Sequence, residues 1–409
     1  MKIKNRLTAA IFVILILTFP IFSVYSTKRN NTLEAAGFYE SPFASDAGFP
    51  FETVKTEYKM KYPTENITLH QEVTIGEYNE WLSAKILKGE EPDVFFMTSQ
   101  LFSELYDKGV VKKIIDSEEL NSFCYDRKID SGFVKSAGYG EEIYAIPVAV
   151  DFNLMAVNKK LLTDYGIDKI NDNWTWSDYQ RLCKLLNKEN AQYGFDWEDA
   201  VYSNGGKVVD YLGREDYLNS LNVLNAVNFV YRLNEHMSNR ATIWDFIEGK
   251  VAIEKLNVAD CINMNFDAEE IDYLTMPAGP EGGNISKAEC IYVCIGRHSD
   301  NVKEALKFID ILLSDRVQSE IVNSGYAMSV KKLSNSLILD ETVKKLCALA
   351  DEVLPNAFIV HRFRDDKYIF DIIDKRIEES IYSGVKPDNV LSELHLEISD
   401  FLNKKSKYY

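Results

Sequence analysis

The strongest constraint on this chain is the alternation of short, continuously apolar runs with longer amphipathic stretches. The run "DVFFM" at 93–97 is followed by the helical pattern "QLFSELYDKG", and the same order recurs downstream. Strands that are apolar on both faces are typical of sheets covered by helices on both sides, which favours parallel α/β layers. At 409 residues the chain exceeds one ordinary core, so we expect two or three domains.

Charge and composition narrow the class of partner. The formal net charge is -17, with 46% hydrophobic and 27% charged residues, as in a globular protein. Binding to a phosphate backbone or to anionic lipid needs clustered Lys and Arg, which a chain this acidic lacks. We therefore expect no nucleic-acid partner, and contact with a membrane only through the N-terminus.

The N-terminus departs from the rest of the chain. The basic "MKIKNR" precedes an uncharged apolar segment, Leu7–Val24. This order is typical of an export signal, with the following chain placed outside the cytoplasm. About 20 apolar residues can also span a bilayer, so residues 1–30 are either a cleaved signal or a retained anchor. The third interpretation is that Leu7–Val24 forms a buried core helix.

Motifs for catalysis, cofactors and metals are missing from the sequence. There is no GxxxxGK, no GxGxxG after a strand and no HExxH, and the five histidines form no cluster. The six cysteines have no metal-type spacing, and Cys290 and Cys294, four apart on one strand, would lie about 13 Å apart. We predict no catalytic residue, cofactor or metal, and expect the cysteines to be small buried residues.

Two helical stretches carry local patterns that a structure can test. In "NWTWSDYQRLCKLLNK", Ser177 and Gln180 have the spacing of a capping box. In "YLNSLNVLNAVNFVYRLNEH", residues Leu221, Leu224, Val227 and Tyr231 recur at helical spacing and predict the buried face.

One strand carries a carboxylate in its middle. The stretch "YAIPVAVDFNLMAVNKKLL", 144–162, starts as a buried strand, meets Asp151 and Asn153, and becomes apolar again. A carboxylate inside a sheet needs a partner, whereas one at a cleft can accept hydrogen bonds from a ligand. The 23 Tyr, 22 Phe and 5 Trp would supply rings for a carbohydrate pocket, although most of them are expected in cores.

The order of several segments resembles the extracellular solute-binding proteins of carbohydrate ABC transporters, the maltose-binding type. The segments run from "EEPDVFFM" and "LYDKGVVKKI" through "IYAIPVAVDFNLMAVNKKLLTDYGI" and "NWTWSDYQRL" to "SNGGKVV", "FIEGKVAI", "MPAGPEGG" and "EALKFIDILLSDRVQSEIVNSGYAMSV". The resemblance covers residues 50 to 409. It implies a type II periplasmic-binding-protein fold of α/β class, in which a three-segment hinge joins two lobes.

The resemblance also implies domain limits. Lobe I would comprise 31–149 and 276–325, and lobe II 150–275 and 326–409. The chain would cross between the lobes at Pro147–Asp151, Thr275–Gly283 and Gly325–Val330. Asp151 would then lie at the first crossing, which explains a carboxylate inside an apparent strand.

The same resemblance implies a ligand site in the cleft between the lobes. Asn257 or Asp260 would replace a Trp that is common in the family after "GKVAI". The predicted ligand-binding residues are Thr98, Ser99, Gln100, Asp151, Asn153, Asp196, Trp197, Tyr202, Asn257, Tyr326 and Arg362.

The expected function is capture of a small solute, in particular a saccharide, and its delivery to an ABC transporter permease by a monomeric extracytoplasmic protein. Three alternatives stay open at this stage. They are an exported enzyme acting on glycans with paired carboxylates in the cleft, a membrane-anchored ligand sensor with the same fold, and a surface protein that has lost its ligand.

Overall fold

The computed structural model describes residues 32–44, 47–71, 73–139, 142–186, 195–210, 213–234, 243–264, 266–267, 269–360 and 366–406. The predicted signal or anchor at 1–30 and the predicted ligand contact Arg362 lie outside these residues. Within them, no helix combines the length and the apolar character needed to cross a bilayer.

Most strands join one large sheet. The strands are β1 Thr32–Ala36, β2 Asn66–His70, β3 Val94–Thr98, β4 Ile115–Asp116, β5 Gly138–Tyr139, β6 Glu142–Ile143, β7 Ala145–Asn158, β8 Ile253–Asn257, β9 Ile271–Leu274, β10 Lys287–Ile295 and β11 Phe358–Ile359. The main sheet runs β2-β1-β3-β10-β7-β8, with β11 paired to β10 and β9 paired to β7, while β4, β6 and β5 form a small second sheet.

The expected parallel pairing holds for only part of the sheet. β1 is parallel to β2 and β3, but β10 is antiparallel to β3 and β7, and β7 is antiparallel to β8 and β9. A strand buried on both faces has the same apolar composition whichever way it runs, so the sequence pattern cannot give its direction.

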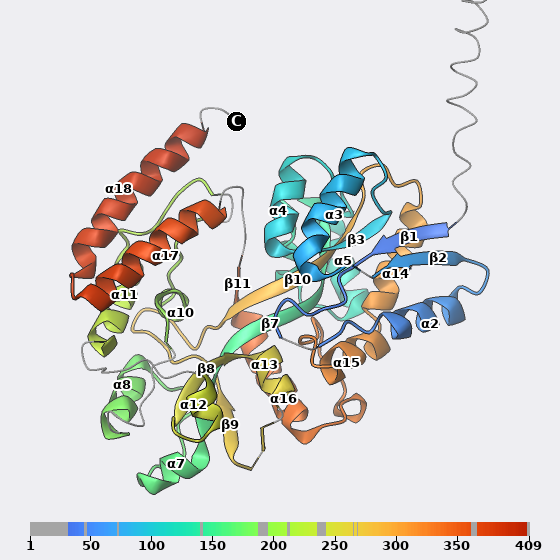
Figure 1. Ribbon diagram of the computed structural model, residues 1–409. Coiled ribbons are helices and arrows are strands. Elements are labelled where there is room, and N and C mark those ends of the chain that lie inside the picture. The colour runs from blue at the N-terminus through green and yellow to red at the C-terminus, as the bar shows by residue number, and fades with distance from the viewer. Residues whose placement is uncertain are drawn as a thin grey trace, which may run out of the picture.

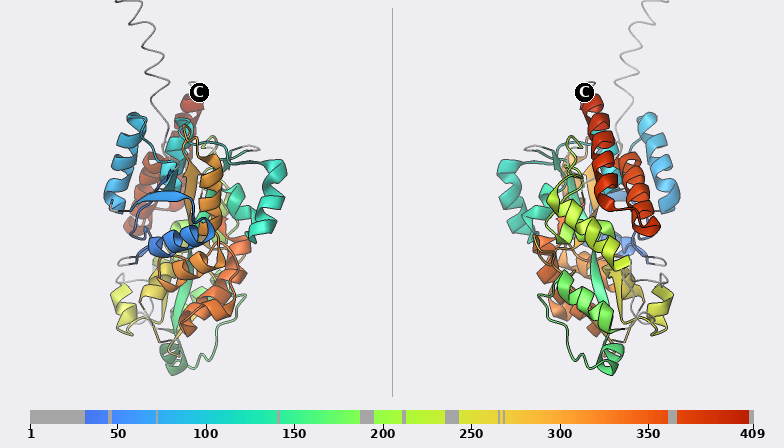
Figure 2. Two further views of the ribbon diagram at one scale, coloured as in Figure 1. Left: turned by 90° about the vertical axis from the view of Figure 1, so that its right-hand side faces the viewer. Right: turned by 90° about the vertical axis from the view of Figure 1, so that its left-hand side faces the viewer.

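Helices cover the sheet from several sides (Figure 1). They are α2 Phe51–Lys61, α3 Ile75–Leu87, α4 Ser99–Asp107, α5 Ser117–Arg127, α6 Ser131–Lys135, α7 Lys159–Asp164, α8 Trp176–Leu185, α10 Trp197–Ser203, α11 Leu221–Asn234, α12 Ile243–Ile247, α13 Val258–Asn263, α14 Val302–Leu312, α15 Asp315–Asn323, α16 Glu341–Val353, α17 Asp366–Ser383 and α18 Pro387–Ser406, with 3-10 turns η1 Asn335–Leu337 and η2 Leu354–Asn356. α11, α17 and α18 pack against one another (Figure 2).

Strand β7 explains the carboxylate inside an apolar run. It is one continuous strand of 14 residues. Residues 145–152 pair with β10, whereas residues 153–158 pair with β8 and β9. The strand therefore changes partners between Phe152 and Asn153, and Asp151 lies beside this seam. The domain limits given above stay a prediction.

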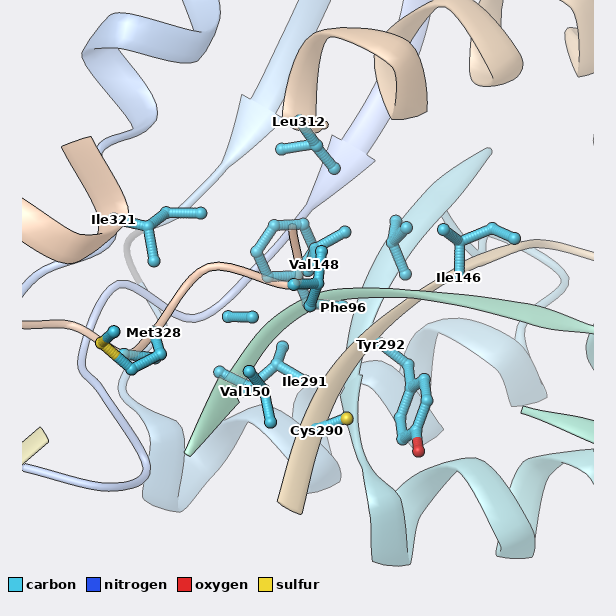
Figure 3. Close-up of a cluster of buried hydrophobic side chains, with 14 of the residues drawn as sticks. Phe96, Ile146, Val148, Val150, Cys290, Ile291, Tyr292, Leu312, Ile321 and Met328 are labelled. Carbon is cyan, nitrogen blue, oxygen red and sulfur yellow. The ribbon is translucent and has the colours of Figure 1, made fainter. Parts of the chain in front are cut away.

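Two large apolar cores pack on β7. The first contains β1, β3, β10 and the start of β7, and Figure 3 shows part of it around Phe96, Val148 and Ile291. The second is built from α8, α10, α11, α17 and α18. Leu154 of β7 joins the first core and Met155 the second. Successive side chains of one strand thus serve both cores, because they point to opposite faces of the sheet.

One local prediction was wrong and another was right in part. α8 begins with a capping box between Thr175 and Asp178, not Ser177 and Gln180, because the helix starts two residues earlier and Thr175 accepts the bond from the Asp178 N–H. In α11, Val227 is buried and Leu224 and Tyr231 pack partly buried against the second core, as predicted, but Leu221 is 71% exposed. The fully buried face is Val223, Ala226, Val227, Phe229, Val230 and Leu233. The neighbours of α11 on α10, α17 and α18 select this face, and local periodicity does not contain them.

The six cysteines are free, as expected for small buried residues. Cys347 is half-buried, and the other five are buried.

Candidate functional site

Polar side chains gather on one face of the sheet at the seam in β7. Asp151 lies opposite Glu289 of β10, and Asn153 lies opposite Asn257 of β8. Lys255 is opposite Met155, two positions further along the same face. Since alternate residues of a strand share a face, these side chains lie on one face of the sheet, where Asn153 and Lys255 contact the start of α10 while Asp151 and Asn257 contact α13. The strand register therefore assembles charges that are far apart in sequence.

The α10 N-terminus meets Lys255 in a partly buried charge cluster. The Asp196 carboxylate caps the helix by accepting the Asp199 N–H at 2.9 Å. Lys255 Nζ lies 2.5 Å from Asp196 Oδ2 and 3.3 Å from Asp199 Oδ2. Asn153 Nδ2 donates to the remaining Asp199 oxygen, Oδ1, at 2.8 Å. The cluster ties α10 to β7 and β8.

The two carboxyl groups of this cluster have widely separated pKa values. Burial alone would raise the pKa of Asp196, but the charge of Lys255 outweighs it and lowers the pKa to about 2. For Asp199, burial and the neighbouring Asp196 charge raise the pKa to about 6. Burial would lower the pKa of Lys255, yet the Asp199 and Asp196 charges raise it, so this lysine stays protonated.

Carboxyl groups with separated pKa values can serve as an acid and a base in catalysis. The Asp199 side chain has no exposed surface, however, and both carboxylates contact Lys255. A substrate cannot reach Asp199 in this arrangement. The cluster therefore acts as an electrostatic clamp that fixes the start of α10.

A second set of contacts joins α10 to β10 and α17. Lys287 Nζ donates to Glu198 Oε2 at 2.6 Å, and the indole N–H of Trp197 donates to Asp374 Oδ1 at 3.0 Å. Burial, together with the Glu198 charge, raises the pKa of Asp374 to about 6. The ring of Tyr202 stacks on Phe358 with centroids 4.0 Å apart. Trp197 and Tyr202 are buried, so packing already uses most of their ring surface.

Asp151 receives a hydrogen bond from the first turn of α13. Its Oδ1 accepts the Ala259 N–H at 3.1 Å, and burial raises its pKa well above the usual range. Asn257 caps the same helix by accepting the Asp260 N–H at 2.7 Å. Both residues therefore position α13 against β7.

A loop from the N-terminal part of the chain covers this end of α13. Ala44 and Ala47 pack on Ala259, and Asn257 Nδ2 donates to the Phe43 carbonyl at 3.3 Å. The same loop reaches the third predicted crossing, where Ser41 Oγ donates to the Tyr326 carbonyl at 2.6 Å. These contacts join α13 and the segment at Tyr326 to residues 41–44 and 47 of this loop, close to Asp151.

The predicted ligand contact Tyr326 lies in the core. It is wholly buried, and its ring packs edge-on against Phe49 with centroids 5.1 Å apart. Its hydroxyl has no hydrogen-bond partner within the described residues.

A cavity of about 580 Å³ separates α4 from α17, which face each other in Figure 1. This size lies within the range of small-molecule sites. Its lining consists of side chains that bear carboxylates, ammonium groups, an amide and one phenol. They are Gln100, Glu104 and Asp107 of α4 with the following Lys108, and Asp366, Lys367, Tyr368 and Asp371 of α17.

Only one residue of the predicted loop after β3 lines this cavity. Gln100 does so and is exposed. Thr98 caps α4 by accepting the Leu101 N–H, and the buried Ser99 donates to the Cys290 carbonyl at 3.3 Å.

The structure thus divides the predicted site residues into separate groups. Asn153 and Asp196 come together in the clamp around Lys255, Asp151 and Asn257 meet at α13, and Gln100 lines the cavity. All eleven positions stay predictions as ligand contacts.

Sequence reasoning missed both lysines of the seam and the α17 side of the cavity. Lys255 and Lys287 are charged residues within or at the start of apolar strands, which is the signal that could have found them. No group of three or more His, Cys, Asp or Glu side chains within the described ranges is arranged to hold a metal ion.

Comparison with known proteins identifies this architecture. The family model described as bacterial extracellular solute-binding protein matches residues 46–319. The sugar-binding protein MalE from Xanthomonas citri superposes with a TM-score of 0.77 at 13% identity, covering 92% of this chain and 98% of that one.

Two further structures match over similar lengths. The cyclic alpha-maltosyl-1,6-maltose binding protein from Arthrobacter globiformis gives a TM-score of 0.75 at 11% identity, covering 91% and 99% of the two chains. An ABC substrate-binding protein from Listeria monocytogenes, in complex with cycloalternan, gives a TM-score of 0.68 at 15% identity and also covers 91% and 99% of the two chains. These similarities establish a type II periplasmic-binding-protein fold.

Proposed function

The chain belongs to the bacterial extracellular solute-binding proteins, and we propose that it captures a sugar or oligosaccharide between α4 and α17 and delivers it to an ABC transporter permease. The observation that carries this proposal is the cavity of about 580 Å³, because its two walls belong to separately packed helices: α4 packs on β3 and β10, and α17 on α11 and α18. The similar structures named for sugars support a saccharide as the solute.

The lining of the cavity suits a polyhydroxylated ligand. Carboxylates such as Glu104 and Asp371 accept hydrogen bonds from sugar hydroxyls, and the amide of Gln100 can both donate and accept. The Tyr368 ring packs against Phe401 with centroids 5.6 Å apart but is still 57% exposed, so part of its ring surface can contact the apolar side of a pyranose.

We propose that binding works through a hinge equilibrium between the lobes defined above, 31–149 with 276–325 and 150–275 with 326–409. The change of pairing partners in β7 supports the first crossing. A ligand that contacts α4 and α17 together does so only when they approach each other, so it shifts the population toward the closed form. The clamp around Lys255 would keep α10 and β8 moving as one body.

The family places this protein outside the cytoplasm. We propose that residues 1–30 either direct export and are removed or stay as the only membrane anchor, and that the protein acts as a monomer. The family and the similar structures are binding proteins. We propose that this chain likewise catalyses no reaction, which the inaccessibility of Asp199 supports.

A thermal-shift screen tests the proposed function. Saccharides from mono- to oligosaccharides are compared with amino acids and polyamines as controls. A solute present at a hundred times its dissociation constant adds about 2.7 kcal/mol to the free energy of unfolding. We expect a clear rise in melting temperature with one saccharide class. A rise with amino acids or polyamines alone, or with no solute of a broad panel, would contradict saccharide capture.

A further inference from the structure

A second cavity lies on another part of the molecule. It has a volume of about 380 Å³ and shares no lining residue with the cavity between α4 and α17. Its walls come from the α5–α6 turn, the segment 328–335 and α16 with η2, and α16 lies at the lower side of Figure 1, away from α4 and α17. The size is again within the range of small-ligand sites.

The floor of this cavity is apolar. Phe133, Met328 and Val330 are buried there, and Cys347 and Leu354 are half-buried beside them. Such a surface favours an apolar group of a ligand, since its removal from water drives binding.

The rim carries charge, and most of that charge is already paired. Lys331 Nζ lies 2.5 Å from an Asp315 oxygen, and Lys332 Nζ lies 2.7 Å from an Asp351 oxygen. The Asp130 carboxylate accepts the Gly132 N–H at 2.6 Å.

Lys128 differs from its neighbours on the rim. The side chain is exposed, and no carboxylate in the described part of the chain forms an ion pair with it. The rim therefore presents one ammonium group beside an apolar floor.

The backbone of Lys128 makes this lysine unusual. It closes α5 in the left-handed conformation, with φ 57° and ψ 40°. The other eight described residues with positive φ are all glycines, which adopt this conformation without a steric penalty. A lysine at such a position is strained, and strain of this kind is found where a side chain has a function.

We propose that this cavity is a second binding site that takes a small amphipathic anion, with its apolar body on the floor and its acidic group beside Lys128. The site is separate from the proposed saccharide cavity. Its walls flank the third predicted crossing, because α6 packs on β7 while α16 packs on β9 and α13. A ligand in the cavity would touch both sides of that crossing.

Binding of 8-anilinonaphthalene-1-sulfonate, followed by its fluorescence, tests the proposal on the purified protein. The dye joins an aromatic body to one sulfonate. We expect saturable binding to the wild type and a dissociation constant about tenfold higher in both K128G and K128Q, the factor for a lost charge-assisted hydrogen bond. The matched control is K88G, which removes an exposed lysine at the end of α3, and its affinity should equal that of the wild type.

Cys347 reports where the dye sits, because it is the one half-buried cysteine and lines the cavity. Burial raises the pKa of this thiol to about 11, so its reaction with a maleimide is slow, and bound dye should slow it further in the wild type. Equal dye affinity in the wild type and K128Q, or a labelling rate that the dye leaves unchanged, would overturn the proposal.

The melting temperature of K128G provides a separate test. We expect it to equal or exceed that of the wild type, because glycine relieves the left-handed strain. A lower melting temperature would assign Lys128 to stabilising the end of α5, where a cation interacts favourably with the helix dipole, and would also overturn the proposal.

Discussion

Replacement of Lys255 by methionine tests the clamp at the seam. In the wild type this lysine lies between Asp196 and Asp199, and its side chain is 26% exposed. Methionine keeps much of the side-chain length and removes the charge. Two carboxylates then face each other without the cation between them, and the wholly buried Asp199 loses its ion pair.

The structure sets the size of the expected loss. Removing one member of a buried ion pair costs about 3 to 5 kcal/mol. Asp196 is 41% exposed, so solvent screens its share, and we expect K255M to lower the free energy of unfolding by about 3 kcal/mol at pH 7.5. At pH 5.0 Asp199 is already protonated, since its pKa is about 6. K255M then removes only the ion pair with Asp196, and the expected loss in free energy of unfolding falls to about 1 kcal/mol.

Urea unfolding of K255M at the two pH values measures this effect. The matched control is K250M, because Lys250 pairs with Asp245 and Glu248 while its side chain is 60% exposed. Exposed pairs contribute little, so K250M should stay within about 0.5 kcal/mol of the wild type. A K255M cost equal to that of K250M, or a cost independent of pH, would refute the account of the clamp.

Three further predictions concern Asp199, Asp151 and two glycines. Burial raises the pKa of Asp199 above its value in the unfolded chain, so the free energy of unfolding should fall as pH rises from about 4 to about 6. D199N should remove this fall. A pH profile of stability that D199N leaves unchanged would contradict the assigned pKa. D151A removes the acceptor of the Ala259 N–H and should lower the free energy of unfolding by about 1 to 3 kcal/mol. D151N keeps an acceptor and should lower it by less. If Asp151 contacts the ligand, D151N should also weaken saccharide binding. G384A introduces only left-handed backbone strain of about 1 kcal/mol, whereas G325A also places a Cβ 2.6 Å from Asn263 Oδ1. The melting temperature of G325A should therefore be clearly lower than that of G384A. Equal melting temperatures would contradict the proposed clash.

Local patterns allowed much of the fold to be predicted. The apolar run ending at Met97 is strand β3, and Gly89 and Gly109 follow α3 and α4 with positive φ, as expected for helix ends. These features depend on a few neighbouring residues, so the sequence contains them directly. The segment order that resembled the maltose-binding type predicted the family, which the match over residues 46–319 confirms.

Features set by long-range packing could not be predicted in the same way. The pairing of β7 with β10 before the seam and with β8 and β9 after it depends on strands that lie far away in the sequence. The place of Leu221 in α11 was misassigned for the same reason. Leu221 fits the helical period, yet it is 71% exposed.

The candidate site shows the same division. Asn153 was predicted from the polar break in an apolar strand and Asp196 from the resemblance, and both lie in the cluster around Lys255. Lys255 was missed because its partner Asp196 is 59 residues away, so nothing local indicates the pair. The α17 wall of the cavity was missed because its charged residues look like an ordinary solvated helix face.

The central claim is that a saccharide binds between α4 and α17, and calorimetric titration of the wild type and Q100W tests it most directly. Gln100 is exposed and lines the cavity, so a tryptophan there should fill the space without disturbing a core. The titrant is the saccharide that gives the largest thermal shift. We expect one site in the wild type and an affinity at least about tenfold lower in Q100W, with an unchanged melting temperature. Equal affinity in the two proteins, or no binding to the wild type, would contradict the account.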